Sequence, residues 1–122
     1  SASNMQWGGY GITTGLTSRT NGLGNTEALI ASSESYPAAE FCAGLVLNGF
    51  DDWHLPAIDE LARMYENRVY LPAGQAFDSN YYWSSTEDSS VLARLLHFGD
   101  GSENISGKSN NYLVRAVRRS VL

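Results

Sequence analysis

The sequence has few of the residues that would tie it to a metal, a disulfide framework or a membrane. A single cysteine, Cys42, excludes an internal disulfide and a cysteine-based zinc site. The two histidines, His54 and His97, are far apart, and neither has a second ligand at metal-binding spacing. No apolar run reaches the length of a membrane span. We therefore expect no cofactor, no metal site and no membrane insertion.

Charged residues are also sparse. They make up 17% of the chain, and the acidic ones prevail, with a formal net charge of −5. A negative domain is a poor candidate for binding nucleic acid or sulfated polysaccharide, because both need a positive surface. We expect no nucleic-acid partner.

The size of the chain predicts a single domain over residues 1–122. Its 122 residues, 43% of them hydrophobic, are enough to bury one core without disulfides. The chain opens on Ser1 without a start methionine. We therefore expect it to be the C-terminal part of something longer.

Two segments carry the periodicity of an amphipathic helix. The first runs from Tyr36 to Leu47, with a buried face of Ala38, Phe41, Cys42, Leu45 and Val46. The second runs from Pro56 to Arg68, with an apolar stripe of Ile58, Leu61, Ala62 and Tyr65. Asn25-Thr26-Glu27 also resembles a helix start. On this interpretation Cys42 is a small buried hydrophobe and not a reactive thiol.

The second half of the chain has the residue pattern of β-strands. We predict strands over 81–86, 91–98 and 112–119, with Gly99-Asp100-Gly101 as a hairpin turn. Helices followed by strands predict an α+β fold, with two helices packed on a mostly antiparallel twisted sheet with long loops. We expect Trp7 to fill the core, together with Leu96 and Phe98.

No motif reaches the level of an enzyme signature. His54 stands alone, which favours a structural role. The acids Asp51, Asp52, Asp59 and Glu60 lack the alternation of a calcium loop and are interpreted as turn and helix-cap residues. Ser84-Ser85-Thr86 offers hydroxyls without a base, so we expect hydrogen bonds to the backbone. We predict no catalytic residue and no enzyme.

Three stretches carry a family resemblance. Residues 49–56 with Asp59-Glu60-Leu61 follow the pattern G-x-x-D-W-x-L-P-x-x-x-E-L, residues 82–87 read Y-W-S-S-T-E, and residues 113–119 resemble a closing V-R-x-V-R. Together they resemble the collagen-like adhesin C-terminal domain family, and Met5-Gln6-Trp7 is similar to members found in phage tail fibres. The resemblance implies a C-type-lectin-like fold, although the calcium-dependent sugar motifs of true C-type lectins are absent.

The side chains in these motifs are expected to have roles within the scaffold. Trp53 and Trp83 are expected in the core. Arg115 and Arg118 are candidates to pair with Glu60 or Glu87.

This family includes the variable proteins of diversity-generating retroelements, in which adenine changes in asparagine codons diversify a surface. Lys, Glu, Gln, Met and Trp cannot arise in this way, so Glu103 and Lys108 would be fixed positions. The reachable residues between Asp88 and Leu113 predict the ligand-binding surface: Asp88, Ser89, Ser90, Val91, Leu92, Arg94, Leu95, His97, Ser102, Asn104, Ile105, Ser106, Ser109, Asn110 and Asn111. The alternative is an ordinary polar hairpin, since turns use the same residues.

The resemblance implies a ligand-binding display domain on a virion tail fibre or a bacterial cell surface. Its partner would be a cell-surface protein or glycan receptor, and its assembly a homotrimer. The alternative is a non-diversified bacterial adhesin domain that binds host or bacterial surface polysaccharide. An enzyme of the formylglycine-generating kind is disfavoured, because such enzymes rely on cysteines that this chain lacks.

Overall fold

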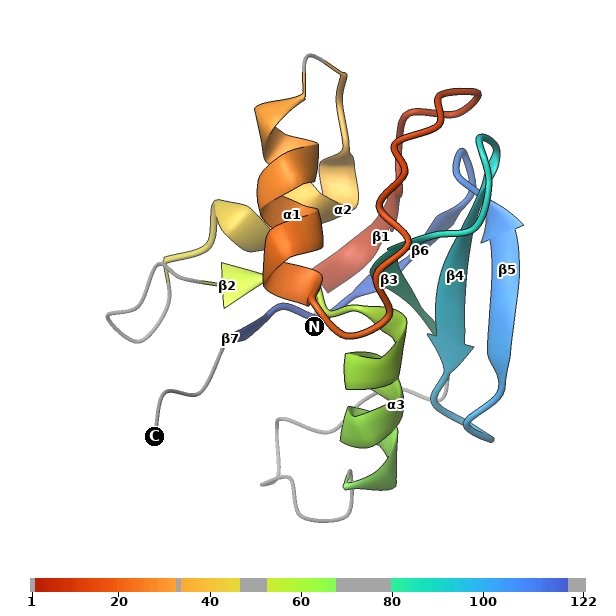
Figure 1. Ribbon diagram of the computed structural model, residues 1–122. Helices are drawn as coiled ribbons and strands as arrows, with labels where there is room; N and C mark the ends of the chain where they lie inside the picture. The colour runs from red at the N-terminus through yellow and green to blue at the C-terminus, as the bar shows by residue number, and fades with distance from the viewer. Residues whose placement is uncertain (1, 33, 47–52, 68–79, 119–122) are drawn as a thin grey trace.

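The computed structural model describes residues 2–32, 34–46, 53–67 and 80–118. These residues form three helices and two sheets, which confirms the predicted α+β class (Figure 1). The helices are α1 (Gly22–Ala31), α2 (Pro37–Ala43) and α3 (Ile58–Glu66). The strands are β1 (Ala2–Gln6), β2 (Trp53–His54), β3 (Tyr81–Glu87), β4 (Leu92–His97), β5 (Glu103–Gly107), β6 (Asn111–Val114) and β7 (Val117–Arg118).

The main sheet brings the first strand, β1, beside the late strand β6. Its strand order is β1-β6-β3-β4-β5, and all neighbours are antiparallel except the β3–β6 pair. The hairpin predicted around Gly99-Asp100-Gly101 connects β4 to β5. Gly101 has a φ of 77°, and a Cβ at this position would meet the ring of Tyr65. The turn therefore depends on glycine and lies against α3.

The helices differ from the prediction in number and in length. The polar residues Asn25 and Thr26 are buried inside α1, and Asn21 is the N-cap, accepting a hydrogen bond from the Gly24 N–H. The cap is therefore one turn earlier than expected. The Thr26 hydroxyl bonds the backbone of Leu55, which explains why polar residues lie on the buried side of this helix.

The predicted helix over 36–47 is only partly right. α2 ends at Ala43, with Gly44 as its C-cap. Its buried side chains are Ala38, Ala39 and Cys42, whereas Phe41 is 37% exposed and Val46 is 75% exposed. Two turns are too short to carry the i+7 and i+8 positions of a longer amphipathic face.

The predicted strand over 112–119 is in fact two strands in different sheets. β6 belongs to the main sheet, and β7 pairs with β2 through His54↔Val117. Simple alternation in the sequence does not reveal the break at Arg115-Ala116, because the pattern is the same on both sides of it.

The core consists of two clusters on the sheet. The larger contains Trp7, Trp83 and residues of α1 and α2, and the smaller contains Leu96, Phe98 and residues of α3. Trp7 is 1% exposed and Trp83 is fully buried, as predicted. Their indole N–H groups donate to the carbonyl oxygens of Ser84 at 2.8 Å and Met5 at 2.9 Å. Trp53, also expected in the core, is half-buried.

Candidate ligand-binding surface

One face of the main sheet combines aromatic rings with small polar side chains. Cross-strand partners point to the same face, and the register pairs Tyr81 with His97 and Leu95 with Asn104. The rings of Tyr81 and His97 meet at 4.6 Å between centroids. Tyr112 of β6 contacts Tyr81 at 5.7 Å.

The position of Tyr112 is set by a hydrogen bond that crosses the sheet. Its hydroxyl lies 2.8 Å from the Ser106 Oγ on β5, although β3 and β4 separate the two strands. The Tyr112 ring also packs edge-on against Trp83, with centroids 5.0 Å apart. We call the accessible residues Tyr81, His97, Asn104, Ser106 and Tyr112 the aromatic face. Tyrosines held this way present large contact area with little entropy left to lose on binding.

The opposite face of β4 and β5 carries a network of ion pairs. Arg94 bonds Asp88 at 2.9 Å and Glu103 at 2.8 Å. Glu103 also binds Arg19 at 2.6 Å, and Arg19 binds Asp59 at 3.0 Å. The hydrogen bond from Arg19 is the largest cause that lowers the pKa of Glu103. This network ties the segment before α1 to β5 and to α3.

Three connections meet at one end of the main sheet (Figure 1). They are the segment after β1, the β3–β4 connection and the β5–β6 connection. Backbone hydrogen bonds join them: Gly11 N–H donates to Ser90 O at 2.8 Å, and Lys108 N–H to Val91 O at 2.9 Å. We call residues 88–91 and 108–111 with residues 8–15 the loop end.

A buried ion pair holds the loop end in place. The Lys108 ammonium has no exposed surface, and its Nζ lies 2.7 Å from Glu87 Oε2 and 2.9 Å from Ile12 O. Glu87 also accepts hydrogen bonds from the N–H groups of Thr14 and Gly15. Burial alone would raise the pKa of Glu87, but these donors lower it overall. Among the described residues, Glu87 therefore pairs with Lys108, a partner that the sequence did not suggest. The side chain of Arg118 lies outside the described part of the chain.

The structure divides the predicted ligand residues into three groups. The aromatic face and its adjoining turn hold His97, Ser102, Asn104 and Ser106; the opposite face holds Leu92, Arg94 and Ile105; the loop end holds Asp88, Ser89, Ser90, Val91, Ser109, Asn110 and Asn111. All of these are half-buried or exposed.

Leu95 does not belong to this surface. It is 1% exposed and packs in the larger core cluster, because its strand position directs it beneath the aromatic rings. Leu96 and Phe98 are also buried, as expected.

Several accessible aromatic and apolar residues beside this surface are not among the predicted ligand residues. Tyr81 and Tyr112 lie on the aromatic face, and Tyr10 (60% exposed) and Ile12 (38% exposed) lie on the loop end. Strand alternation contained a signal for Tyr81, which is two residues before the buried Trp83 and shares its face. Nothing in the sequence places residues 10 and 12 beside residue 90.

The other candidate residues have structural roles where they are described. Ser84, Ser85 and Thr86 are buried, and the Ser84 and Thr86 hydroxyls donate to backbone carbonyls, as predicted. Cys42 is buried, which raises the pKa of its thiol. Asp51 and Asp52 lie outside the described residues. Within the described ranges, no group of three His, Cys, Asp or Glu could hold a metal ion, and no helix is long and apolar enough to cross a membrane.

The fold and this surface define a class of protein: an α+β domain that presents an accessible face of mixed aromatic and polar side chains on a rigid sheet. A family model, the Lcl C-terminal domain, matches residues 3–118. The chain belongs to the Lcl C-terminal domain family, which agrees with the resemblance found in its motifs and indicates a ligand-binding domain. A search of curated proteins gave no significant match.

Proposed function

We propose that this domain displays a receptor-binding surface on a virion tail fibre or a bacterial cell surface. The ligand is a cell-surface protein or glycan, bound by the aromatic face and the loop end. Family membership supports the ligand-binding role, and the α+β architecture with long loops is compatible with the C-type-lectin-like fold that the motifs imply.

The observation that carries the proposal concerns residues 88–111. Most of those that adenine changes could produce are accessible, whereas those that could not arise in this way hold ion pairs within the fold. The residues reachable by adenine changes are accessible apart from Ala93 and the core residues Leu95, Leu96 and Phe98. The two that are not reachable, Glu103 and Lys108, both hold ion pairs that join separate parts of the fold. Diversification would then change contacts with the ligand and leave the scaffold intact.

Substitution of the aromatic face is expected to remove binding without unfolding the domain. Changing His97, Asn104 and Ser106 together to alanine removes polar contacts from β4 and β5, and we expect at least about a tenfold loss of binding. The free energy of unfolding should change by about 1–2 kcal/mol, because none of the three is buried and the main loss is the hydrogen bond between Ser106 and Tyr112. Binding is measured with labelled domain on a glycan array and on bacterial cells, and stability by urea unfolding.

The matched control is Phe41→Ala on α2, which is also partly exposed but lies on neither the sheet nor the loop end. It should leave binding unchanged. A triple variant that binds normally, or that unfolds, would rule out the aromatic face as the ligand surface. A near-identical template repeat beside a reverse transcriptase gene would identify the diversified form of this function.

The alternative is a non-diversified adhesin domain that binds polysaccharide. It predicts that the domain binds a charged polysaccharide such as heparin. Retention on heparin at physiological salt would favour it, particularly with a collagen-like repeat preceding the domain. The net charge of −5 leads us to expect elution below physiological salt. The measurement is a salt gradient on heparin resin, with a basic domain of similar size as the control.

A further inference from the structure

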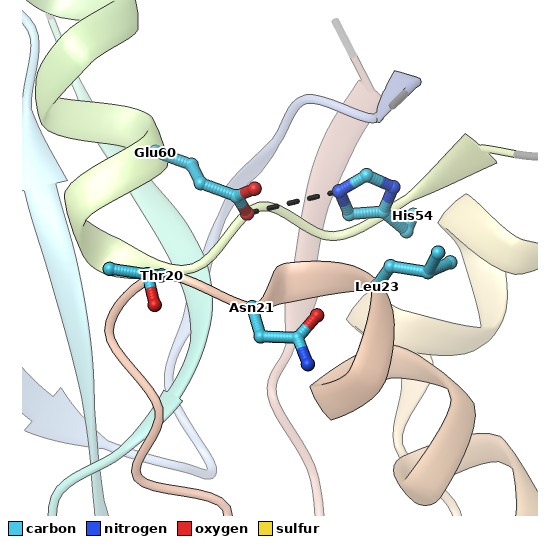
Figure 2. A pocket seen from close by; sticks show the side chains of 5 residues that line it. All are labelled: Thr20, Asn21, Leu23, His54 and Glu60. Atoms are coloured by element: carbon cyan, nitrogen blue, oxygen red, sulfur yellow. Dashed lines mark ion pairs between the residues drawn. The ribbon is translucent and has the colours of Figure 1, made fainter. Parts of the chain in front are cut away.

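A pocket of about 250 Å³ lies on another part of the molecule, between the start of α1 and the start of α3 (Figure 2). The described residues that line it are Thr20, Asn21, Leu23, His54 and Glu60. They come from the segment before α1, from the first turn of α1, from β2 and from the first turn of α3. None of them belongs to the aromatic face or the loop end.

His54 is the unusual feature of this pocket. Its side chain is 2% exposed, and neither Nδ1 nor Nε2 has a hydrogen-bond partner among the described residues. Nε2 lies 3.8 Å from Glu60 Oε1, which is beyond hydrogen-bond distance. Buried polar groups normally have partners, because a buried donor or acceptor without one has lost its hydrogen bonds to water and gained none in return. A ligand with its own donors and acceptors would supply a partner for Nε2, the nitrogen on the side of Glu60 (Figure 2).

The Glu60 carboxylate has one oxygen engaged by the protein and one available to such a ligand. Oε1 accepts hydrogen bonds from Ala57 N–H at 2.8 Å and Gly22 N–H at 3.1 Å, at the beginnings of α3 and α1. Burial alone would raise the pKa of Glu60, but His54 and these two donors lower it overall, so the carboxylate is ionised at neutral pH. Among the described residues no donor reaches Oε2, which leaves that oxygen as an acceptor.

The remaining lining groups offer both donors and acceptors. A neutral imidazole has one donor and one acceptor nitrogen, and the Thr20 hydroxyl can act as either. Asn21 uses its Oδ1 as the cap of α1, which leaves its Nδ2 as a donor. Leu23 adds one apolar wall. The chemistry is therefore mixed and closely spaced, and it is not suited to a ligand of a single polarity.

We propose that this pocket binds a neutral polyhydroxylated ligand, such as a sugar unit with vicinal hydroxyl groups. Each hydroxyl is at once a donor and an acceptor, so a pair of them can satisfy His54 and Glu60 together while the C–H face packs on Leu23. An ammonium ion would leave the imidazole and Asn21 donors unmatched, and an anion would face the Glu60 carboxylate. The source of the hydroxyls is either a free polyol or the terminal sugar of a glycan.

The proposal is tested by NMR titration of the full chain, with the His54 ring protons as reporter. The probes are glycerol, glucose, galactose and their methyl glycosides, with ethylammonium chloride and sodium acetate as charged controls. We expect saturable shifts with at least one hydroxylated probe and none with the charged ones. Binding of methyl glycosides identifies a glycan-terminal sugar, and binding confined to glycerol and free sugars identifies a free polyol.

Variants locate the binding. Thr20→Val removes an exposed hydroxyl at constant shape, and Asn21→Asp keeps the cap oxygen while removing the Nδ2 donor; each should raise the dissociation constant by about three- to tenfold. His54→Phe should raise it by at least about tenfold. His97→Phe, on the aromatic face, is the matched control and should have no effect.

Three results would overturn the proposal: no saturable shift with any hydroxylated probe, equal binding of acetate or ethylammonium, or loss of binding in His97→Phe but not in Thr20→Val and Asn21→Asp. The last result would place the sugar on the aromatic face. Because Thr20 is exposed, its variant keeps the test valid even if His54→Phe does not fold.

Discussion

Replacing Lys108 with methionine is expected to lower the free energy of unfolding by about 3–5 kcal/mol, because the change leaves the Glu87 carboxylate buried without its partner. Lys108 and Glu87 are 0% and 2% exposed, and the ammonium also donates to Ile12 O. The lost charge further removes a contact with the Trp7 ring, 4.8 Å from Nζ. Urea unfolding followed by circular dichroism measures the effect.

Two further variants separate the buried charge from ordinary loss of packing. Lys108→Met combined with Glu87→Gln removes both charges, and we expect it to recover part of the lost stability. Arg94→Met breaks partly exposed ion pairs with Glu103 and Asp88 and should cost about 1 kcal/mol or less. If Lys108→Met were no more destabilising than Arg94→Met, the pair would not hold the loop end.

The Lys108–Glu87 ion pair also predicts how the difference in stability between the wild type and Lys108→Met depends on pH. The pKa of Glu87 lies below its ordinary value of 4.5, so its contribution to stability is present above that value and is lost as pH falls through the folded-state pKa. Without Lys108, burial favours the protonated acid instead. The stability difference between the wild type and Lys108→Met should therefore shrink as pH falls, beginning above 4.5 where the variant's carboxylate takes up its proton and continuing through the lowered folded-state pKa of the wild type. Unfolding free energies measured from pH 7 to pH 3 test this.

Replacing Trp7 with alanine is expected to cost about 3–5 kcal/mol, because the side chain is buried in the larger core cluster. Trp7 is 1% exposed, packs edge-on against Tyr36 at 5.5 Å, and donates its indole N–H to Ser84 O. The cavity would open between α2 and the sheet, and the loop end would lose the ring beneath Lys108. The measurement is again urea unfolding.

Trp7→Phe separates the contribution of the indole hydrogen bond to stability from that of the volume that the side chain fills. It keeps an aromatic ring but leaves Ser84 O without the indole donor, which should cost about 1–3 kcal/mol. Val46→Ala is the control for shortening an apolar side chain, because Val46 is 75% exposed and should change stability by about 0.5 kcal/mol or less. A Trp7→Ala protein as stable as the Val46→Ala protein would show that the core does not depend on this ring.

Local patterns in the sequence predicted the fold class and most elements of the second half. The strands around Trp83 and Leu95, and the turn between β4 and β5, follow from alternation and glycine chemistry that act over a few residues. α3 was predicted for the same reason, since Ile58 and Leu61 are one turn apart.

Predictions failed where distant partners override the local pattern. Asn25 and Thr26 read as a helix cap, yet they are buried inside α1 because Ser18, Leu55 and Ser85 supply hydrogen bonds. Leu95 read as a surface residue because its codon class and its neighbours resemble those of the exposed positions. Its burial depends on which sheet face carries Trp83 and Tyr112, and that information is not local.

The amino-acid sequence by itself determined that this chain is an α+β domain of the Lcl C-terminal kind, with its accessible polar segment between residues 88 and 111. Only the tertiary structure decided that Tyr81 and Tyr112 join that segment, that Glu87 pairs with Lys108, and that His54 meets Glu60 at a pocket. The physical reason is the distance along the chain over which each interaction acts. Periodicity and turn chemistry act between neighbours in the chain, whereas these contacts join residues that only the strand order β1-β6-β3-β4-β5 and the helix packing bring together.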